Sequence, residues 1–177
     1  MQIMSATDPP AQFDEVVLPH LDAAYNLARW LAGNDHDAED ITQEASLRAF
    51  RFFGGFRGGN SRSWLLTIVR HTACTWLKKN RPDAIVPVNE DQLQEIEDPA
   101  GPDPSAAFSG ADAKVLQTAL EQLPAEFREV IVLRELEGLA YKEIADVVDA
   151  PLGTVMSRLA RARRQLQQCL SRKGDWK

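Results

Sequence analysis

Residues 141–164 read YKEIADVVDAPLGTVMSRLARARR, and this stretch points most directly to the fold of the C-terminal half. Its first part places Ile144 and Val148 on one side of a short helix, with the small Ala145 where a second helix must cross closely. A tight turn at 149–153, which ends in Gly153, is expected to set the crossing angle of the two helices. Together these features predict a helix-turn-helix.

The helix expected after this turn, at 154–170, has an apolar side and a polar side. The apolar side runs through Val155, Leu159, Ala162 and Leu166. On the polar side, the first turns can offer hydrogen bonds to base edges in a major groove, and arginines farther along can contact phosphates. The alternative is a buried helical hairpin whose basic face is only solvated. The DNA-binding residues expected here are Thr154, Ser157, Arg158, Arg161 and Arg164.

The whole chain is predicted to be all-α, with two small helical domains joined by an extended acidic linker. Helical spacing of apolar residues covers 13–81 and 113–173. Residues 82–112 hold five prolines among acids and small residues, which is typical of a linker. The polar start, 1–12, is expected to be flexible.

Three helices are expected in the first domain. The first ends at Gly33 and Asn34, because both residue types accept the left-handed conformation of a helix C-cap. The second begins in the acidic segment 35–40, and a glycine-rich loop at 54–60 separates it from a long helix over 61–80. The residues expected to face the core are Leu21, Ala24, Tyr25, Ala28, Leu31, Ile41, Ala45, Leu47, Phe50, Leu65, Ile68, Val69, Thr72 and Trp76.

The chain carries a net charge of −6, but its charges are strongly separated along the sequence. No basic residue lies between Arg81 and Lys114, and the eight acids there exceed the whole net charge. The rest of the chain therefore sums to about +2, and residues 158–173 carry six basic residues and no acid. A basic helix can approach phosphates while the acidic segment repels them.

The composition argues against an enzyme, a metal protein and a membrane protein. His20, His36 and His71 do not stand with cysteines or carboxylates in a metal or triad pattern, and the glycine-rich loop lacks the strand that precedes a phosphate-binding motif. Cys74 and Cys169 lie far apart, as expected of reduced thiols. Without a long apolar run or a secretory signal, we expect a cytoplasmic protein with no membrane insertion, cofactor or metal.

Two parts of the chain resemble a known family. Residues 123–166 read LPAEFREVIVLRELEGLAYKEIADVVDAPLGTVMSRLARARRQL and are similar to region four of sigma factors, specifically the extracytoplasmic-function (ECF) group. Residues 37–50 read DAEDITQEASLRAF, and 56–73 read FRGGNSRSWLLTIVRHTA. Both stretches are similar to region two of the same group. The resemblance covers about 13–81 and 113–172, in the order that the family has.

The resemblance implies a transcription initiation factor that binds RNA polymerase core enzyme and promoter DNA. Region two would open the promoter element near minus ten, and region four would read the element near minus thirty-five. By motif, Asp40, Gln43 and Glu44 match the polymerase-binding positions. Their i, i+3, i+4 spacing places them on one helix face, where they can meet a basic partner helix. The alternative is an ordinary solvated acidic face.

The loop 56–62 matches the family segment that holds a flipped promoter base. Its glycines allow close approach of the backbone, and Asn60 offers both a donor and an acceptor to a base edge. Cationic groups on the next helix suit contacts with a single strand. Trp64 and Trp76 are expected in the core rather than stacked on bases. The expected DNA-binding residues of region two are Asn60, Arg62, Arg70, His71 and Lys78.

Two positions depart from the family pattern. Ala140 stands where a Ser or Thr helix cap is common, so Glu143 forms only half a capping box. Met156 stands where a basic residue is frequent, and it either reads a thymine methyl group or contributes nothing.

The sequence therefore predicts a sigma factor that directs core polymerase to the promoters of a stress or envelope response regulon. Because family members are often held inactive by an anti-sigma protein, such a partner is a further expectation. The main alternative is a helix-turn-helix transcriptional regulator without direct core polymerase contact. The region-two motifs favour the sigma factor, and tight binding of duplex DNA by the chain alone would favour the regulator.

Overall fold

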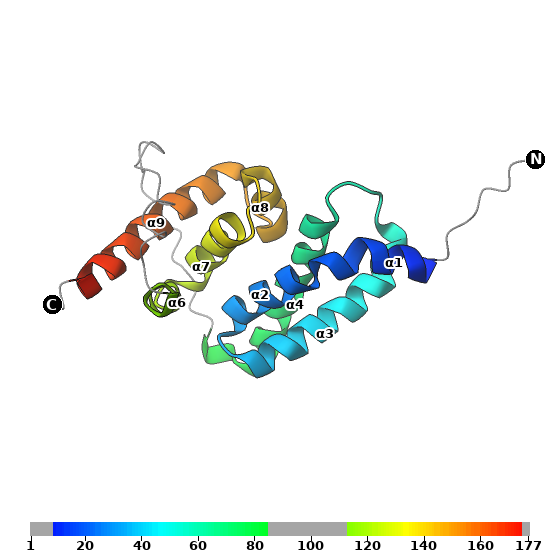
Figure 1. Cartoon of the computed structure of the whole chain (residues 1–177), viewed down its shortest axis with the longest axis horizontal. Helices are drawn as coiled ribbons and strands as arrows, with labels where there is room; N and C mark the ends of the chain where they lie inside the picture. Colours follow the sequence, from blue (N-terminus) through cyan, green and yellow to red (C-terminus); the bar gives the residue numbers. More distant parts are fainter. Residues whose placement is uncertain (1–8, 85–112, 175–177) are drawn as a thin grey trace, which may run out of the picture. The chain divides into compact units, whose positions relative to one another are not determined.

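A computed structural model of the chain describes residues 9–84 and 113–174 (Figure 1). All regular elements in these ranges are helices, which confirms the all-α prediction. The chain divides into two compact units, Met1–Trp76 and Leu77–Lys177. No helix in the described part of the chain is both long and apolar enough to span a membrane.

Unit 1 is built from four α-helices and short 3-10 turns. The first helix begins at Pro9, inside the segment 1–12 that was expected to be flexible. A proline there is compatible with a helix, because the first-turn N–H groups have no partner within the helix. The elements are α1 (Pro9–Val17), η1 (Leu18–His20), α2 (Leu21–Ala32), α3 (Asp35–Phe52), η2 (Phe53–Gly55) and α4 (Ser61–Asn80), the last of which runs past the boundary at Trp76. The short η3 (Pro82–Ala84) follows α4 and falls within the range of unit 2.

The predicted flexible start and acidic linker fall largely outside the described residues. Residues 1–8 of the predicted flexible start and residues 85–112 of the predicted linker are not described. Both assignments stay predictions.

The turn between α2 and α3 is made by Gly33 and Asn34, which have different roles. Gly33 ends α2 in the left-handed conformation, with φ 82°, as predicted. Asn34 is extended, with φ −149°, and its side-chain oxygen accepts the N–H of Asp37 at 2.9 Å. The expectation that Asn34 belongs to the C-cap is therefore wrong, because it is the N-cap of α3.

The packing of α2 against α3 relies mainly on small side chains. Ala24, Ala28, Ala38, Ala45 and Ala49 are all buried. Ile41 also faces this core, as predicted. The prediction was wrong for Leu47 and Phe50, whose exposed fractions are 54% and 53%. On α3 the residues that recur at helical spacing on the buried side are mostly alanines. The prediction had chosen Leu47 and Phe50 because they are larger and more apolar.

Helix α4 has the predicted bounds and most of the predicted buried side. Leu65, Val69 and Thr72 are buried, whereas Ile68 and Trp76 are only half-buried. The remaining buried positions are Leu66 and Ala73. The start of the helix is linked to η1, because His20 Nε2 lies 3.0 Å from Ser61 Oγ.

Unit 2 has a core of larger aliphatic side chains. Its final helix, α9, packs against three preceding helices of the unit. A π-helical segment extends the second of these helices, a feature that the sequence did not predict. The elements are α6 (Ala113–Glu121), α7 (Ala125–Ile131), η5 (Val132–Leu136), α8 (Tyr141–Val148) and α9 (Leu152–Gly174). The fully buried side chains include Leu120, Ile131, Leu133, Ile144, Leu159 and Leu166.

The helix-turn-helix is present, but its turn differs in detail from the prediction. Asp149 adopts the left-handed conformation, with φ 52°, and the N–H groups of Asp149 and Ala150 both point to the carbonyl oxygen of Ala145. Aspartate tolerates this conformation better than most residues. Helix α9 begins at Leu152 rather than at the predicted Thr154, so Gly153 lies in its first turn and not in the connecting turn.

Candidate nucleic-acid and partner interfaces

Asp40, Gln43 and Glu44 lie together on the exposed side of α3, as their spacing predicts. The side chains of Asp40 and Glu44 are each 48% exposed. Glu44 pairs with Arg48 at 3.0 Å, one turn along the same helix. Such exposed pairs contribute little to stability, so these carboxylates can exchange their local partner for a basic partner helix.

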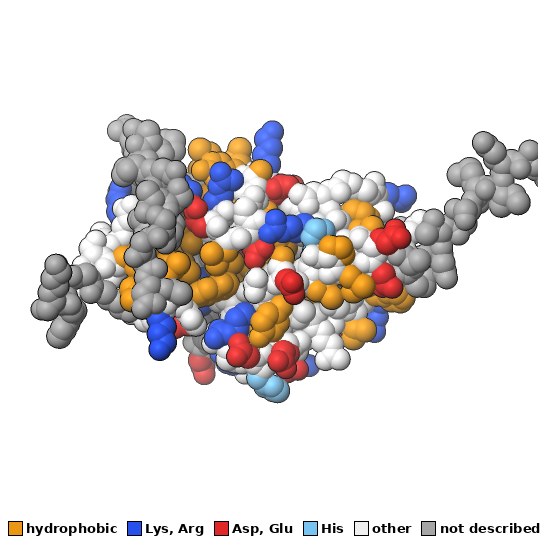
Figure 2. Space-filling view, viewed as in Figure 1, with side chains coloured by type: hydrophobic (Ala, Val, Ile, Leu, Met, Phe, Trp, Pro, Cys, Tyr) orange, Lys and Arg blue, Asp and Glu red, His pale blue; other side chains and the backbone are white. Residues whose placement is uncertain are grey.

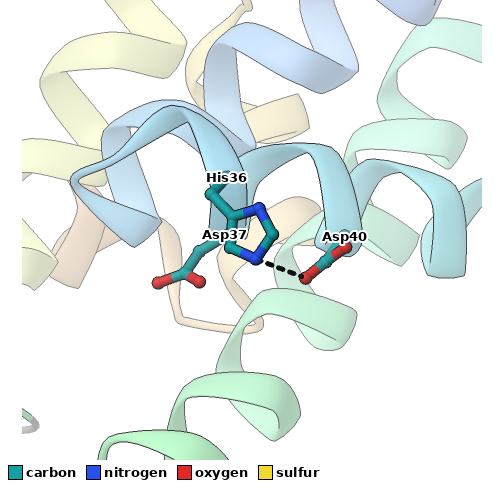
Figure 3. A group of neighbouring side chains, drawn as sticks. All are labelled: His36, Asp37 and Asp40. Atoms are coloured by element: carbon teal, nitrogen blue, oxygen red, sulfur yellow. Dashed lines mark ion pairs between the residues drawn. The ribbon is translucent and has the colours of Figure 1, made fainter.

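A second group on α3 contradicts the statement that no histidine stands with carboxylates. The ligand atoms of His36, Asp37 and Asp40 lie within 4.8 Å of one another, and His36 Nε2 is 3.8 Å from Asp40 (Figure 3). The three residues share the exposed start of one helix, and Asp37 already accepts a hydrogen bond from Asn34 at 2.7 Å. Acids at a helix start interact favourably with its dipole, so a metal is not needed to explain them.

The glycine-rich loop before α4 has a conformation that requires glycine. Gly58 and Gly59 have φ angles of 86° and 91°, which L side chains rarely adopt. Asn60 then caps the helix, because its side-chain oxygen accepts the N–H of Ser63 at 3.1 Å. The sequence indicated Asn60 as a base-reading residue and did not anticipate this capping role.

An aromatic cluster surrounds the same loop. Phe13 of α1 meets Phe50 and Phe53 edge-on, at centroid distances of 5.2 and 5.5 Å. Phe56 lies 5.9 Å from Phe53 and 5.1 Å from Trp64. These phenylalanines line an open hollow of about 700 Å³. Trp64 is therefore part of a ring cluster, in agreement with its predicted packing role, whereas the hollow was not predicted.

The expected DNA-binding residues of α4 do not share one face. Successive residues of an α-helix are turned by about 100°. His71 follows Arg62 by nine residues and therefore lies on the opposite side. His71 and Lys78 are exposed, whereas Arg62 and Arg70 are half-buried. The structure groups His71 with Lys78, and it separates Arg62 from them.

On α9 the structure separates the predicted DNA-binding arginines into two kinds. Arg161 is half-buried and Arg164 is exposed, whereas Arg158 is only 8% exposed. The guanidinium of Arg158 lies 3.5 Å from a carboxylate oxygen of Glu126 on α7. The expectation that Arg158 lies on the exposed polar face is wrong, because this position faces α7. Thr154 and Ser157 are half-buried at the start of the helix.

A second arginine of α9 also pairs within unit 2. Arg163 donates to Glu135 of η5 at 2.7 and 3.3 Å. Burial lowers the pKa of Arg163, but hydrogen bonds with Glu135 and Tyr141 raise it more, and the net shift is upward. Arg134 lies 4.7 Å above the ring of Tyr141 and donates to the carbonyl of Leu139 at 2.8 Å. The Arg163–Glu135 pair attaches α9 to η5, and the contacts of Arg134 attach η5 to the start of α8. The sequence spacing did not predict either link.

Arg128 stabilises the end of α6. Its guanidinium donates to the carbonyl oxygens of Leu120, Glu121 and Leu123 at 2.9–3.1 Å. Burial lowers the pKa of Arg128, and nearby Glu121 acts in the opposite direction. At the start of α8, the N–H of Ala140 donates to Glu143 at 2.7 Å, which confirms the predicted half of a capping box.

One drawn face of the molecule carries side chains of both charges. On the face drawn in Figure 2, Asp and Glu side chains alternate with Lys, Arg and apolar side chains. No field of a single sign covers the described part of this face.

The described residues form helices only, with an acidic face on α3 and a helix-turn-helix in unit 2, and this is the architecture of a DNA-binding transcription factor. The model for Sigma-70 region 2 matches residues 16–82, and the model for Sigma-70, region 4 matches 113–166. The chain belongs to the sigma-70 family, within the ECF group.

Curated relatives agree with this family. The ECF RNA polymerase sigma factor SigE of Mycolicibacterium smegmatis is 39% identical over 167 residues, which cover 90% of this chain and 62% of the relative. The chain thus spans less than two thirds of that protein. The RNA polymerase sigma-H factor of Pseudomonas aeruginosa is 34% identical, covering 89% of this chain and 86% of the relative. The ECF RNA polymerase sigma-E factor of Escherichia coli is 37% identical, covering 73% and 72%.

Solved structures show the same fold. The sigma factor RpoE from Bartonella quintana, in complex with the anti-sigma factor NepR, has a TM-score of 0.71 and 28% sequence identity. The match covers 90% of this chain and 97% of that chain. CnrH, in complex with the cytosolic domain of CnrY, has a TM-score of 0.62 at 24% identity, covering 92% of this chain and 89% of that chain.

Proposed function

We propose that this chain directs RNA polymerase core enzyme to specific promoters and initiates transcription of a stress or envelope response regulon. The observation that carries the proposal is the presence of both sigma regions, in order, in one chain. Region two alone has no helix-turn-helix, and region four alone lacks the acidic face of α3. A chain that carries both can couple polymerase binding to promoter recognition.

Region two has two tasks in this proposal. Asp40, Gln43 and Glu44 dock on a basic helix of core polymerase, because they are exposed on one side of α3. The loop at Asn60 holds an unstacked promoter base, and the cations of α4 contact the strand backbone. His71 and Lys78 are the best placed of the expected residues, since both are exposed on one side of α4.

Region four reads duplex DNA upstream. The first turns of α9 enter the major groove, with Thr154 and Ser157 near base edges. Arg161 and Arg164 contact phosphates farther along the helix. Arg158 supports the helix through Glu126 instead of contacting DNA.

Further partners follow from the same role. The Bartonella quintana RpoE was solved with an anti-sigma factor, and we extend this type of partner to the present chain. The acidic residues of 85–112 would pass through the basic polymerase channel, although this segment lies outside the described residues. The chain acts in the cytoplasm, where core polymerase and DNA are found, and it has no enzymatic activity or cofactor of its own.

The competing function is a helix-turn-helix regulator that does not contact core polymerase. Run-off transcription with purified core polymerase on a pool of genomic promoters separates the two. Core polymerase plus this chain should give discrete transcripts that core polymerase alone does not give. The same transcripts from a Gln43→Ala, Glu44→Ala double variant would contradict the docking face. No promoter selectivity at all would contradict the proposed function.

A further inference from the structure

Helix α9 is rich in arginine, but the outward side of its first turns exposes mainly small and apolar side chains. Residues three and four apart share a helix face, so Gly153, Met156, Ser157 and Ala160 follow one another along the side away from the core. Gly153 and Met156 are exposed, and Ser157 and Ala160 are half-exposed. An added Cβ at Gly153 would meet nothing within 4 Å. The first turns of α9 therefore present small side chains and two exposed long apolar side chains, Leu152 and Met156.

The arginine nearest to this surface is directed elsewhere. Arg158 faces Glu126 of α7 and is almost fully buried. Arg161 and Arg164 lie one to two turns farther along the helix, where they are suited to phosphates. The part of α9 that would enter a major groove first thus has no long cationic side chain to read guanine. Small residues at its centre allow the helix backbone to come close to base edges.

We propose that Met156 is a specificity-determining residue that contacts the C5-methyl group of a thymine in the upstream promoter element. This inference rests on the proposed function and names the base chemistry that region four of this chain reads. A thioether has no hydrogen-bond donor, so Met156 cannot reproduce the bidentate contact of arginine with guanine. Its flexible apolar side chain suits the thymine methyl, the only apolar group in the major groove. The upstream element should therefore have an A·T pair opposite Met156.

Leu152 is the one neighbouring residue that could take the same role. It is 39% exposed and Met156 is 37% exposed, and the two lie one turn apart on the same edge of α9. Leu152 is the first residue of the helix, whereas Met156 lies one turn farther along, beside Ser157 and Ala160. The geometry therefore favours Met156, and the experiment must separate the two residues.

The test compares thymine with uracil, which pairs identically but lacks the C5-methyl group. Holoenzyme made from bacterial core polymerase and the full chain first selects duplexes from a pool with a randomised upstream segment. Each selected thymine is then replaced singly by deoxyuridine, and the affinity of the holoenzyme is measured. At one thymine we expect uracil to weaken binding about four-fold, which is the effect of removing one buried methyl group. In Met156→Ala, thymine and uracil should bind equally at that position.

Three variants serve as controls. Met156→Leu keeps an apolar side chain and should keep the preference for thymine. Gln167→Ala removes an exposed side chain three turns along the same side and should change nothing. Leu152→Ala should also keep the preference. Loss of the preference in Leu152→Ala with retention in Met156→Ala would overturn the assignment, as would a uracil effect that persists in Met156→Ala or is absent from the wild type. If the chain enriches no upstream element over core polymerase alone, the proposed function fails, and this inference fails with it.

Discussion

The charged residues of the two units are used in different ways. In unit 1 these ion pairs join residues close in the sequence: Arg48 pairs with Glu44 within α3, and Arg29 at the end of α2 pairs with Asp35 at the start of α3. Both carboxylates remain substantially exposed. In unit 2 the pairs join residues far apart in the sequence: Arg163 of α9 reaches Glu135 of η5, and Arg158 reaches Glu126 of α7. The unit 2 pairs are also more buried.

This difference separates binding charges from structural charges. An exposed pair within one helix contributes about 0.5 kcal/mol or less to stability, so its members are available to a partner. A buried pair costs several kcal/mol when one member is removed, because the other charge is left without compensation. The acidic face of unit 1 should therefore affect binding far more than folding, and the paired arginines of unit 2 should do the reverse.

The largest effect is expected from Gln43→Ala combined with Glu44→Ala. Loss of two central contacts should weaken binding of core polymerase by about 100-fold. The free energy of unfolding should change by less than about 0.5 kcal/mol, because both side chains are exposed. Titration of fluorescently labelled chain with core polymerase measures the first quantity, and urea unfolding measures the second.

Asp22→Asn is a matched control for this variant, because Asp22 is an exposed acid on α2. It should leave polymerase affinity unchanged. Equal losses in Asp22→Asn and in the double variant would indicate a general charge effect and would count against a specific face.

Glu135→Ala should give the next largest effect, this time on folding. The variant leaves Arg163 largely buried without its carboxylate, and we expect unit 2 to lose about 2 kcal/mol of unfolding free energy. Urea unfolding followed by circular dichroism gives this value from the midpoint and the slope. A change below about 0.5 kcal/mol would show that the pair behaves like an exposed one.

The sequence predicted the helices better than the use of their side chains. Helical period, glycines and prolines predicted the long helix over Ser61–Asn80 and the end of α2 at Gly33, because these signals act locally. The alanine-rich contact of α2 with α3 was predicted only in part, because alanine contributes little to the apolar pattern from which buried helix faces are predicted. The cross-element pairs could not be predicted, because Arg158 and Arg163 carry the same local pattern as arginines that bind phosphate.

A comparison of Arg158→Ala with Arg164→Ala tests whether a paired arginine and an exposed arginine of α9 differ in DNA binding. Arg164 is exposed, so its removal should weaken promoter binding by the holoenzyme several-fold and reduce the slope of log affinity against log salt by about 1. Arg158→Ala should leave the salt slope unchanged, since the side chain is buried against Glu126. Fluorescence anisotropy on one promoter duplex over a range of salt gives both slopes. A reduced slope in Arg158→Ala would return this residue to the DNA-binding set.

The smallest effect is expected from Arg48→Ala on α3. This change removes the i, i+4 partner of Glu44, and such pairs contribute about 0.3–0.5 kcal/mol to a helix. In this variant Glu44 no longer has to break its ion pair with Arg48 before it binds a basic partner helix. Polymerase affinity should therefore be retained or slightly raised. Urea unfolding and the polymerase titration measure the two quantities on one preparation. A loss of affinity comparable to that of the Gln43→Ala, Glu44→Ala variant would mean that Arg48 holds Glu44 in its binding position. The Arg48–Glu44 pair of unit 1 would then have a structural role like that of the pairs in unit 2.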